Sequence, residues 1–161
     1  MRCALSAVVV VMFLSIASFG HSASYQAAER SSAVAAIQTA AVAALNFRQG
    51  DAAGLNRSRP DFTINGWKDF MKHMEGFLDG KGAPTFTSSF VAARQATILD
   101  EKDGAVHLRI PGSLTQTSGL AKTVYRRSAL EVYAIRDSGE GEFKIERLKQ
   151  ITCAGSSAAC D

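Results

Sequence analysis

The chain has 161 residues, of which 18 are basic, 15 are acidic and 47% are hydrophobic, and its formal net charge is +3. Residues 1–23 are expected to be removed as a signal peptide. The remaining 138 residues carry 17 basic and 15 acidic side chains, which gives a net charge of +2. This small charge argues against a nucleic-acid partner. The length allows one compact domain and excludes two.

The N-terminus has the three parts of a secretory signal peptide. One basic residue precedes the apolar run Ala4 to Phe19, and the small residues Gly20 to Ser24 follow it. The pattern predicts that residues 1–23 are cleaved near Ser22 or Ala23 and that the protein is periplasmic. An uncleaved anchor that holds the domain at the inner membrane, facing the periplasm, is the alternative, although the apolar run is shorter than the roughly twenty residues of a spanning helix.

Residues 24–152 are predicted to form the folded domain, which begins with an Ala-rich helix over Tyr25 to Phe47. We expect Gly50 to end this helix in a left-handed cap. A short helical turn is expected within Asp51 to Arg59, with Pro60 as its stop. The first helix carries a narrow apolar face of small residues at steps of three and four: Val34, Ile37, Ala41, Ala44 and Leu45.

The next helix is predicted to start at Thr63, whose side chain can cap the free amides of the first turn. Its polar residues lie on one side, and Gly80 to Pro84 break it. The other side repeats large apolar residues at helical spacing: Trp67, Phe70, Met71, Met74, Phe77 and Leu78.

The rest of the domain changes to a strand pattern rich in β-branched and aromatic residues. We expect turns at Asp100 to Gly104 and Asp137 to Gly141, and a bulge at Pro111 and Gly112. Short turns between successive strands predict an antiparallel meander whose inner face the helices cover, an α+β fold. The expected strands are four: Thr85 to Leu99, Val106 to Thr117, Lys122 to Arg136, and Phe143 to Ile151.

The order of these elements, together with several short motifs, resembles a known family. The motifs are Leu45-Asn46-Phe47-Arg48, Phe62-Thr63 with Gly66-Trp67 and Phe70, Leu108-Arg109-Ile110-Pro111 ahead of Leu114-Thr115, and Ile135-Arg136 at the end of a long strand. With them the chain resembles the periplasmic domain of the IcmL/DotI family, inner-membrane components of type IVB secretion systems related to conjugation proteins. The resemblance implies a nuclear-transport-factor-two-like cone, with N-terminal helices packed on a curved antiparallel sheet of about four strands.

The resemblance also implies a function. We expect a periplasmic, non-enzymatic scaffold that contacts other envelope or secretion-system proteins. Self-association is left open, and no cofactor is expected. Members of the family carry a cytoplasmic segment before a membrane anchor, whereas only Met1, Arg2 and Cys3 precede the apolar run here. A free periplasmic relative is therefore expected, with membrane contact only if the N-terminal segment is retained.

Residues 153–161 form a short tail that contains Cys153 and Cys160. An exported chain meets an oxidising compartment, and the Gly/Ser/Ala loop between the two cysteines can bring the sulfurs together, so we expect a disulfide. A metal site is the alternative, but no His or further Cys stands nearby.

The same cone houses isomerases and dehydratases, so a small-molecule-binding or isomerase-like protein is the alternative function. That chemistry needs a desolvated carboxylate base facing a hydrogen-bond donor. Asp61 and Asp69 are the candidate acids, and the ordinary interpretation of both is a solvated side chain. Tyr125 and Tyr133 are the candidate donors, although aromatic residues on strands more often serve packing. No catalytic residue is assigned.

Two histidines lie outside the signal region, His73 and His107, and both are interpreted as partly exposed structural residues, because a metal site would lack a third ligand. Basic residues concentrate on the later strands, which predicts either a solvated outer sheet face or a docking surface for an acidic partner or an anionic membrane. These basic residues are Arg109, Lys122, Arg126, Arg127, Lys144, Arg147 and Lys149.

Overall fold

The computed structural model describes residues 9–78, 86–118, 121–139 and 141–152, and these divide between two compact units, Met1–Ala33 and Val34–Asp161. The first unit holds the N-terminal part of helix α1 (Val9–Leu45). The second unit, called the domain below, holds the end of α1 and all other elements. Within the described part of the chain, no helix is both long and apolar enough to cross a membrane.

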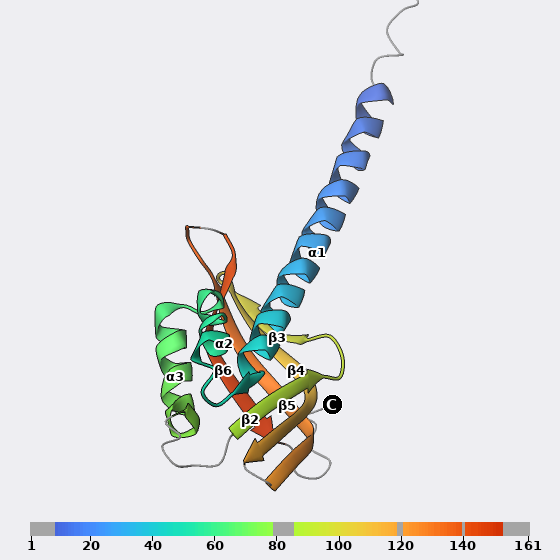
Figure 1. The fold of residues 1–161 in the computed structure, drawn as a ribbon. Coiled ribbons are helices and arrows are strands. Elements are labelled where there is room, and N and C mark those ends of the chain that lie inside the picture. The colour runs from blue at the N-terminus through green and yellow to red at the C-terminus, as the bar shows by residue number, and fades with distance from the viewer. Residues whose placement is uncertain (1–8, 79–85, 119–120, 140, 153–161) are drawn as a thin grey trace, which may run out of the picture. The chain divides into compact units, whose positions relative to one another are not determined.

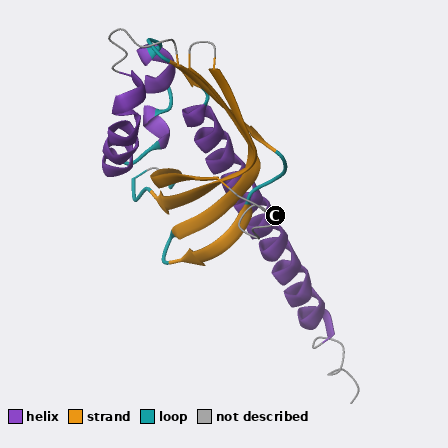
Figure 2. Cartoon of the chain, turned by 90° about the horizontal axis from the view of Figure 1, so that it is seen from below, coloured by secondary structure: helices purple, strands orange, loops and turns teal. Residues whose placement is uncertain are grey.

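The domain is built on one antiparallel sheet, which has six strands among the described residues. The sheet order is β1-β2-β4-β5-β6. On the same side of β4, β2 pairs with residues 112–118 and β3 pairs with residues 105–109. Figure 1 shows the path of the strands, and Figure 2 shows how strongly the sheet curls. The strands are β1 (Phe47–Arg48), β2 (Phe86–Ala92), β3 (Thr97–Lys102), β4 (Ala105–Ser118), β5 (Ala121–Arg136) and β6 (Phe143–Thr152).

The predicted fold class, helices packed on a curved antiparallel sheet, is confirmed. The first expected strand, residues 85–99, is in fact two strands, because the Gln38 side chain holds the chain between them in a bend. Its Nε2 donates to the Arg94 carbonyl (3.3 Å), and its Oε1 accepts from the Ala96 N–H (2.7 Å). The turn expected over residues 100–104 shortens to Asp103 and Gly104, both with positive φ, because β3 continues to Lys102.

Two bulges interrupt the long strands and bend them. The first lies where Gly112 and Leu114 of β4 pair with Ser128 and Tyr125 of β5, so the register shifts at the predicted place, but the extra residue belongs to β5. The second is at Glu146 of β6, because Tyr133 and Ala134 of β5 pair with Arg147 and Ile145. A bulge adds a residue to one strand and increases its local twist, so both contribute to the curl of the sheet.

Helix α1 ends at Leu45, two residues earlier than predicted, because the chain then joins the sheet as β1. The Asn46 Oδ1 accepts a hydrogen bond from the Phe90 N–H (2.6 Å), and Phe47 pairs with Ser88 of β2. Gly50 has a positive φ of 83°, but it lies in the turn after β1. Its predicted role as the helix cap is therefore wrong.

The expected short helix is α2 (Ala52–Asn56), capped by Asp51, whose Oδ1 accepts from the Gly54 N–H (2.7 Å). Pro60 does not stop this helix. It lies instead in the first turn of a 3-10 helix, η1 (Arg59–Asp61), where the missing proline N–H leaves no hydrogen bond unmade.

Helix α3 (Ile64–Leu78) begins as predicted, with the Thr63 hydroxyl oxygen accepting from the Gly66 N–H (2.9 Å). The start of this helix is fixed against the bulge of β6. The Thr63 N–H donates to the Ile145 carbonyl (3.0 Å), and the Thr63 hydroxyl donates to the Glu146 carboxylate. A Cβ on Gly66 would overlap the Ile145 carbonyl oxygen and lie 2.9 Å from that of Glu146.

The hydrophobic core lies between the inner face of the sheet, the end of α1 and α3. The alternation predicted for residues 106, 108 and 110 places all three side chains in this core. Its larger members are Ile37, Leu45, Phe47, Leu55, Phe62, Phe70, Phe86, Phe90, Val106, Leu108, Ile110, Leu114, Leu130, Val132 and Ile145. The predicted helix breaker at residues 80–84 and the predicted disulfide of Cys153 and Cys160 lie outside the described residues.

The close approach of Gly66 to β6 leads to a stability prediction. Gly66→Ala should lower the free energy of unfolding by about 1 to 3 kcal/mol, because the added methyl collides with main-chain atoms that cannot rotate away. Urea unfolding followed by circular dichroism measures this loss. Asn65→Ala, at an exposed position of the same helical turn, is the matched control and should leave stability within about 0.5 kcal/mol. Equal effects of the two substitutions would contradict this account.

Candidate functional site

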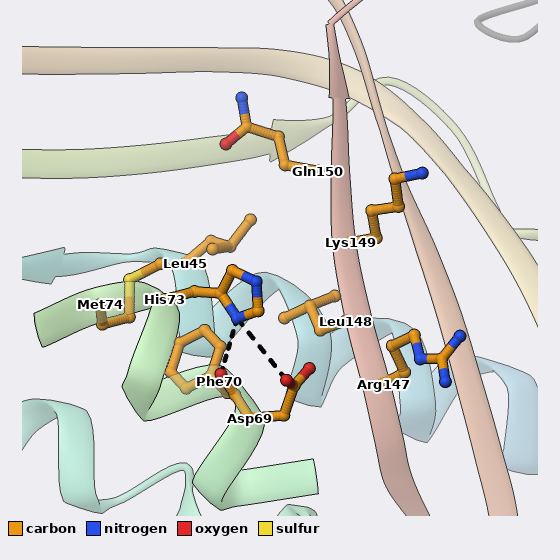
Figure 3. Close-up of a pocket in the computed structure, with 9 residues that line it drawn as sticks. All are labelled: Leu45, Asp69, Phe70, His73, Met74, Arg147, Leu148, Lys149 and Gln150. Atoms are coloured by element: carbon orange, nitrogen blue, oxygen red, sulfur yellow. Dashed lines mark hydrogen bonds and ion pairs between the residues drawn. The ribbon is translucent and has the colours of Figure 1, made fainter.

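A groove of about 540 Å³ lies between α3, the end of α1 and β6, and it is the candidate site. This volume is within the range of about 300 to 1,000 Å³ typical of ligand pockets. Figure 3 shows the side chains around it. The lining residues are Leu45, Asp69, Phe70, His73, Met74, Arg147, Leu148, Lys149 and Gln150.

The two walls of the groove differ in kind. On α3 the lining residues recur at steps of three and four, as expected for one face of a helix. On β6 they are four consecutive residues, 147–150, although successive side chains of a strand point to opposite faces. Figure 3 shows Leu148 and Gln150 on the α3 side of the strand and Arg147 and Lys149 on the other. The edge of β6 itself therefore borders the groove.

The floor of the groove is apolar, and polar groups stand at its rim. Leu45 and Phe70 belong to the buried core. At the rim, the His73 Nδ1 lies 2.7 Å from the Asp69 carbonyl oxygen and 3.8 Å from its carboxylate. The side chains of His73 and Asp69 are 70% and 51% exposed, so this pair is solvated rather than buried.

The opposite face of the sheet carries a second polar group, the outer-face cluster of His107, Arg109, Glu131, Tyr133 and Arg147. The Arg109 guanidinium binds the Glu131 carboxylate (2.8 Å), and the His107 Nε2 lies 4.0 Å from the same carboxylate. The rings of His107 and Tyr133 stack with centroids 3.8 Å apart, and the Arg147 guanidinium lies 5.6 Å from the Tyr133 ring.

This cluster corrects one of the expectations for the basic residues. Arg109 does not belong to a solvated face, because its side chain is only 26% exposed and Glu131 neutralises it. Arg127, Arg147 and Lys149 are exposed, whereas Lys144 is partly buried 3.6 Å from Glu142. The side chains of Lys122 and Arg126 lie outside the described residues.

The candidate catalytic residues do not converge on one cavity. Asp69 lines the groove, but Asp61 lies in η1 and Tyr133 lies on the outer face. The side chain of Tyr125 is outside the described part of the chain. Trp67 does not border the groove either, because its ring packs against Phe62 and Phe70 with centroids 5.5 and 5.6 Å away. Among the described candidates, no cavity therefore brings one of these two acids together with a tyrosine donor.

The two histidines lie on different elements, His73 at the rim of the groove and His107 in the outer-face cluster. Among the described side chains, no group of three or more His, Cys, Asp or Glu residues is arranged to hold a metal ion.

Comparison with known proteins adds information about the fold. No family model matches the sequence, and no curated protein matches it. Solved structures do match. The periplasmic domain of DotI is 23% identical with a TM-score of 0.59, and the alignment covers 71% of this chain and 89% of that domain.

An IcmL-like type IV secretion system protein from Legionella pneumophila matches with a TM-score of 0.55 at 12% identity, over 78% of this chain and 93% of the other. This chain has the fold of the IcmL/DotI-like proteins. The predicted resemblance is thereby confirmed at the level of structure. A protein from Catenulispora acidiphila has a TM-score of 0.52 at 13% identity, over 79% of this chain and 94% of its own length.

Sequence reasoning missed the groove as a site. It counted Arg147 and Lys149 among the basic residues of a solvated sheet face or a docking surface, and it did not connect them with the residues of α3. The sequence did contain a signal for the strand edge beside the groove. Residues 143–151 are the last strand of the predicted meander, and the last strand of a meander pairs with a neighbour on one side only.

Asp61, which lies in η1 outside the groove, provides a test of the electrostatics of the domain. Partial burial raises the pKa of its carboxyl above the usual 3.8, with a smaller lowering by Lys144 and a smaller raising by Glu142. Because the pKa of Asp61 is higher in the folded protein than in the unfolded chain, its ionisation opposes folding. The free energy of unfolding therefore falls as the pH rises above the unfolded pKa and through the folded pKa. Asp61→Asn should therefore raise Tm at about pH 7 relative to the wild type, and this gain should shrink towards about pH 3.5.

Thermal unfolding across this pH range measures the effect. Asp103→Asn is the matched control, because the Asp103 side chain is 85% exposed and Asn tolerates its positive φ. A lower Tm for Asp61→Asn at neutral pH would show instead that attraction to Lys144 outweighs burial.

Proposed function

We propose that this protein is a component of a type IV secretion or conjugation apparatus that acts in the periplasm through protein contacts, as a relative of the IcmL/DotI proteins. The observation that carries the proposal is the similarity of its fold to the DotI periplasmic domain over 89% of that domain. The second match, to a protein of a type IV secretion system, supports the same assignment.

The signal-peptide pattern of residues 1–23 supports a periplasmic location. Cleavage would release a free periplasmic domain, and retention would hold it at the inner membrane. The surfaces available for contact are the groove beside β6 and the exposed basic residues of the outer sheet face. These features suit a protein that docks others rather than one that transforms a substrate.

Small-molecule binding is the second candidate, and the observation that favours it is the volume of the groove. Docking of a protein is favoured over it because one wall of the groove is the edge of a strand, and because the acid at the rim, Asp69, is solvated and paired with His73.

The function is tested in a bacterium that encodes this chain and assembles such an apparatus. A tagged copy is cross-linked in living cells and purified, and the bound proteins are identified by mass spectrometry. We expect components of the apparatus to be recovered, and we expect deletion of the gene to lower substrate transfer until a plasmid copy restores it. Recovery of no component, or unchanged transfer after deletion, would overturn the proposal.

The mature form of the exported protein provides a separate prediction. Intact-mass measurement of the periplasmic fraction should show a chain without residues 1–23 whose mass rises by about 2 Da after reduction, since a disulfide forms in this oxidising compartment. Cys153→Ser should abolish the mass change. A full-length chain found in the membrane fraction would support the anchored form instead.

A further inference from the structure

The strand β6 has a free edge next to the groove. It is the last strand in the sheet order, paired with β5 on one side only among the described residues. Near its start the other side is occupied, because Thr63 binds the Ile145 carbonyl and Phe62 forms a parallel bridge to Ile145. Beyond the bulge at Glu146, no described strand pairs with this edge. An edge of this kind presents N–H and C=O groups that can accept an added strand.

The side chains on the two faces of this edge differ in chemistry. On the groove side, Leu148 continues the apolar floor that Leu45 and Phe70 form. On the outer side, Arg147 and Lys149 are exposed, and Lys149 makes no ion pair among the described residues. A strand added here would place its own side chains alternately over the apolar floor and beside these two cations.

We infer that the groove binds an extended segment of a partner protein by strand addition to β6, and that this segment alternates apolar and acidic residues. The inference deepens the proposed function and rests on it only for the statement that the partner is a protein. Main-chain hydrogen bonds to β6 hold the segment, and the alternating side chains select it. Cross-strand neighbours lie about 4.5 to 5.5 Å apart, so acidic residues on the outer side pair with Arg147 and Lys149.

A second copy of this chain fits the edge poorly. Antiparallel pairing of two β6 strands around residues 147–150 would bring the Arg147 and Lys149 side chains of both copies together, and like charges on neighbouring strands are destabilising. A lysine on an edge strand is also a common barrier to indiscriminate pairing. The same charges that oppose self-pairing attract an acidic segment.

The inference is tested with synthetic peptides and the purified full-length protein. The probe is a fluorescent peptide that alternates Val and Glu over eight residues, and its matched control alternates Val and Lys. Fluorescence anisotropy measures binding. We expect the Val/Glu peptide to bind at least about tenfold more tightly than the Val/Lys peptide, and this difference should decrease as salt is added.

Two N-methylated versions of the Val/Glu peptide separate strand addition from simple occupation of a cleft. In an extended peptide the N–H groups of alternate residues point to the same edge, so methylation of all Val residues blocks one edge and methylation of all Glu residues blocks the other. Strand addition predicts that one version loses binding at least about tenfold and the other retains it. Equal binding of the two versions would overturn the inference.

Charge reversal at the edge is the complementary test. The double variant Arg147→Glu and Lys149→Glu should weaken binding of the Val/Glu peptide about tenfold, because two attractive cross-strand pairs become repulsive. The matched control is Arg94→Glu with Lys102→Glu, which makes the same change of charge at exposed positions in the loop before β3 and at its end. An unchanged Tm verifies that each variant is folded.

The outcomes distinguish this inference from the proposed function. Binding of neither peptide, together with recovery of apparatus components in cells, overturns strand addition and leaves the proposed function in place. Binding of the Val/Glu peptide without recovery of any apparatus component supports strand addition and overturns the proposed function. A dimer detected by sedimentation in place of peptide binding, and strengthened by the single variant Lys149→Glu because it places a carboxylate opposite Arg147 of the other copy, would assign the edge to a second copy and overturn the inference.

Discussion

The contact on which the domain depends is that between the first turn of α3 and the bulge of β6. Thr63 satisfies two requirements at once, because its hydroxyl oxygen caps the helix and its N–H binds the Ile145 carbonyl. Gly66 lets the helix approach the strand more closely than any other residue would allow. This contact sets the position of α3 on the sheet, and the groove lies further along, between the helix and residues 147–150 of β6.

Much of the fold follows from local patterns in the sequence. The alternation in β4, the cap at Thr63 and the register shift at Gly112 each depend on neighbouring residues and could be predicted. The bend between β2 and β3 could not, because it depends on Gln38, which lies about sixty residues away on α1. The position of Gly50 shows the same limit. Its positive φ was predictable, whereas the two-residue strand that separates it from the helix forms only by pairing with β2.

The candidate site was less predictable than the fold, for a physical reason. A list of basic residues does not show which of them are neutralised, and that depends on strand register. Arg109 faces Glu131 across the pairing of β4 with β5, and so it is removed from the exposed positive charge. Lys149 faces the same Glu131 from the other side, but that carboxylate bonds Arg109, and Arg147 lies against the Tyr133 ring, so both cations of the last strand remain exposed.

The residues that follow α1 make the two ends of the sheet unequal. Asn46 and Gln49 direct their side-chain amides to the Phe90 and Phe86 N–H groups of β2, and the Gln49 N–H binds the Phe86 carbonyl. The backbone of β2 is thus occupied by the chain's own side chains, while β3 is kept apart by its bulge and charged residues. The strand at that end, β1, has only two residues, so it offers a further strand a much shorter edge than the ten-residue β6 does. Edges of such unequal length favour the addition of one strand at β6 over head-to-tail growth into a filament.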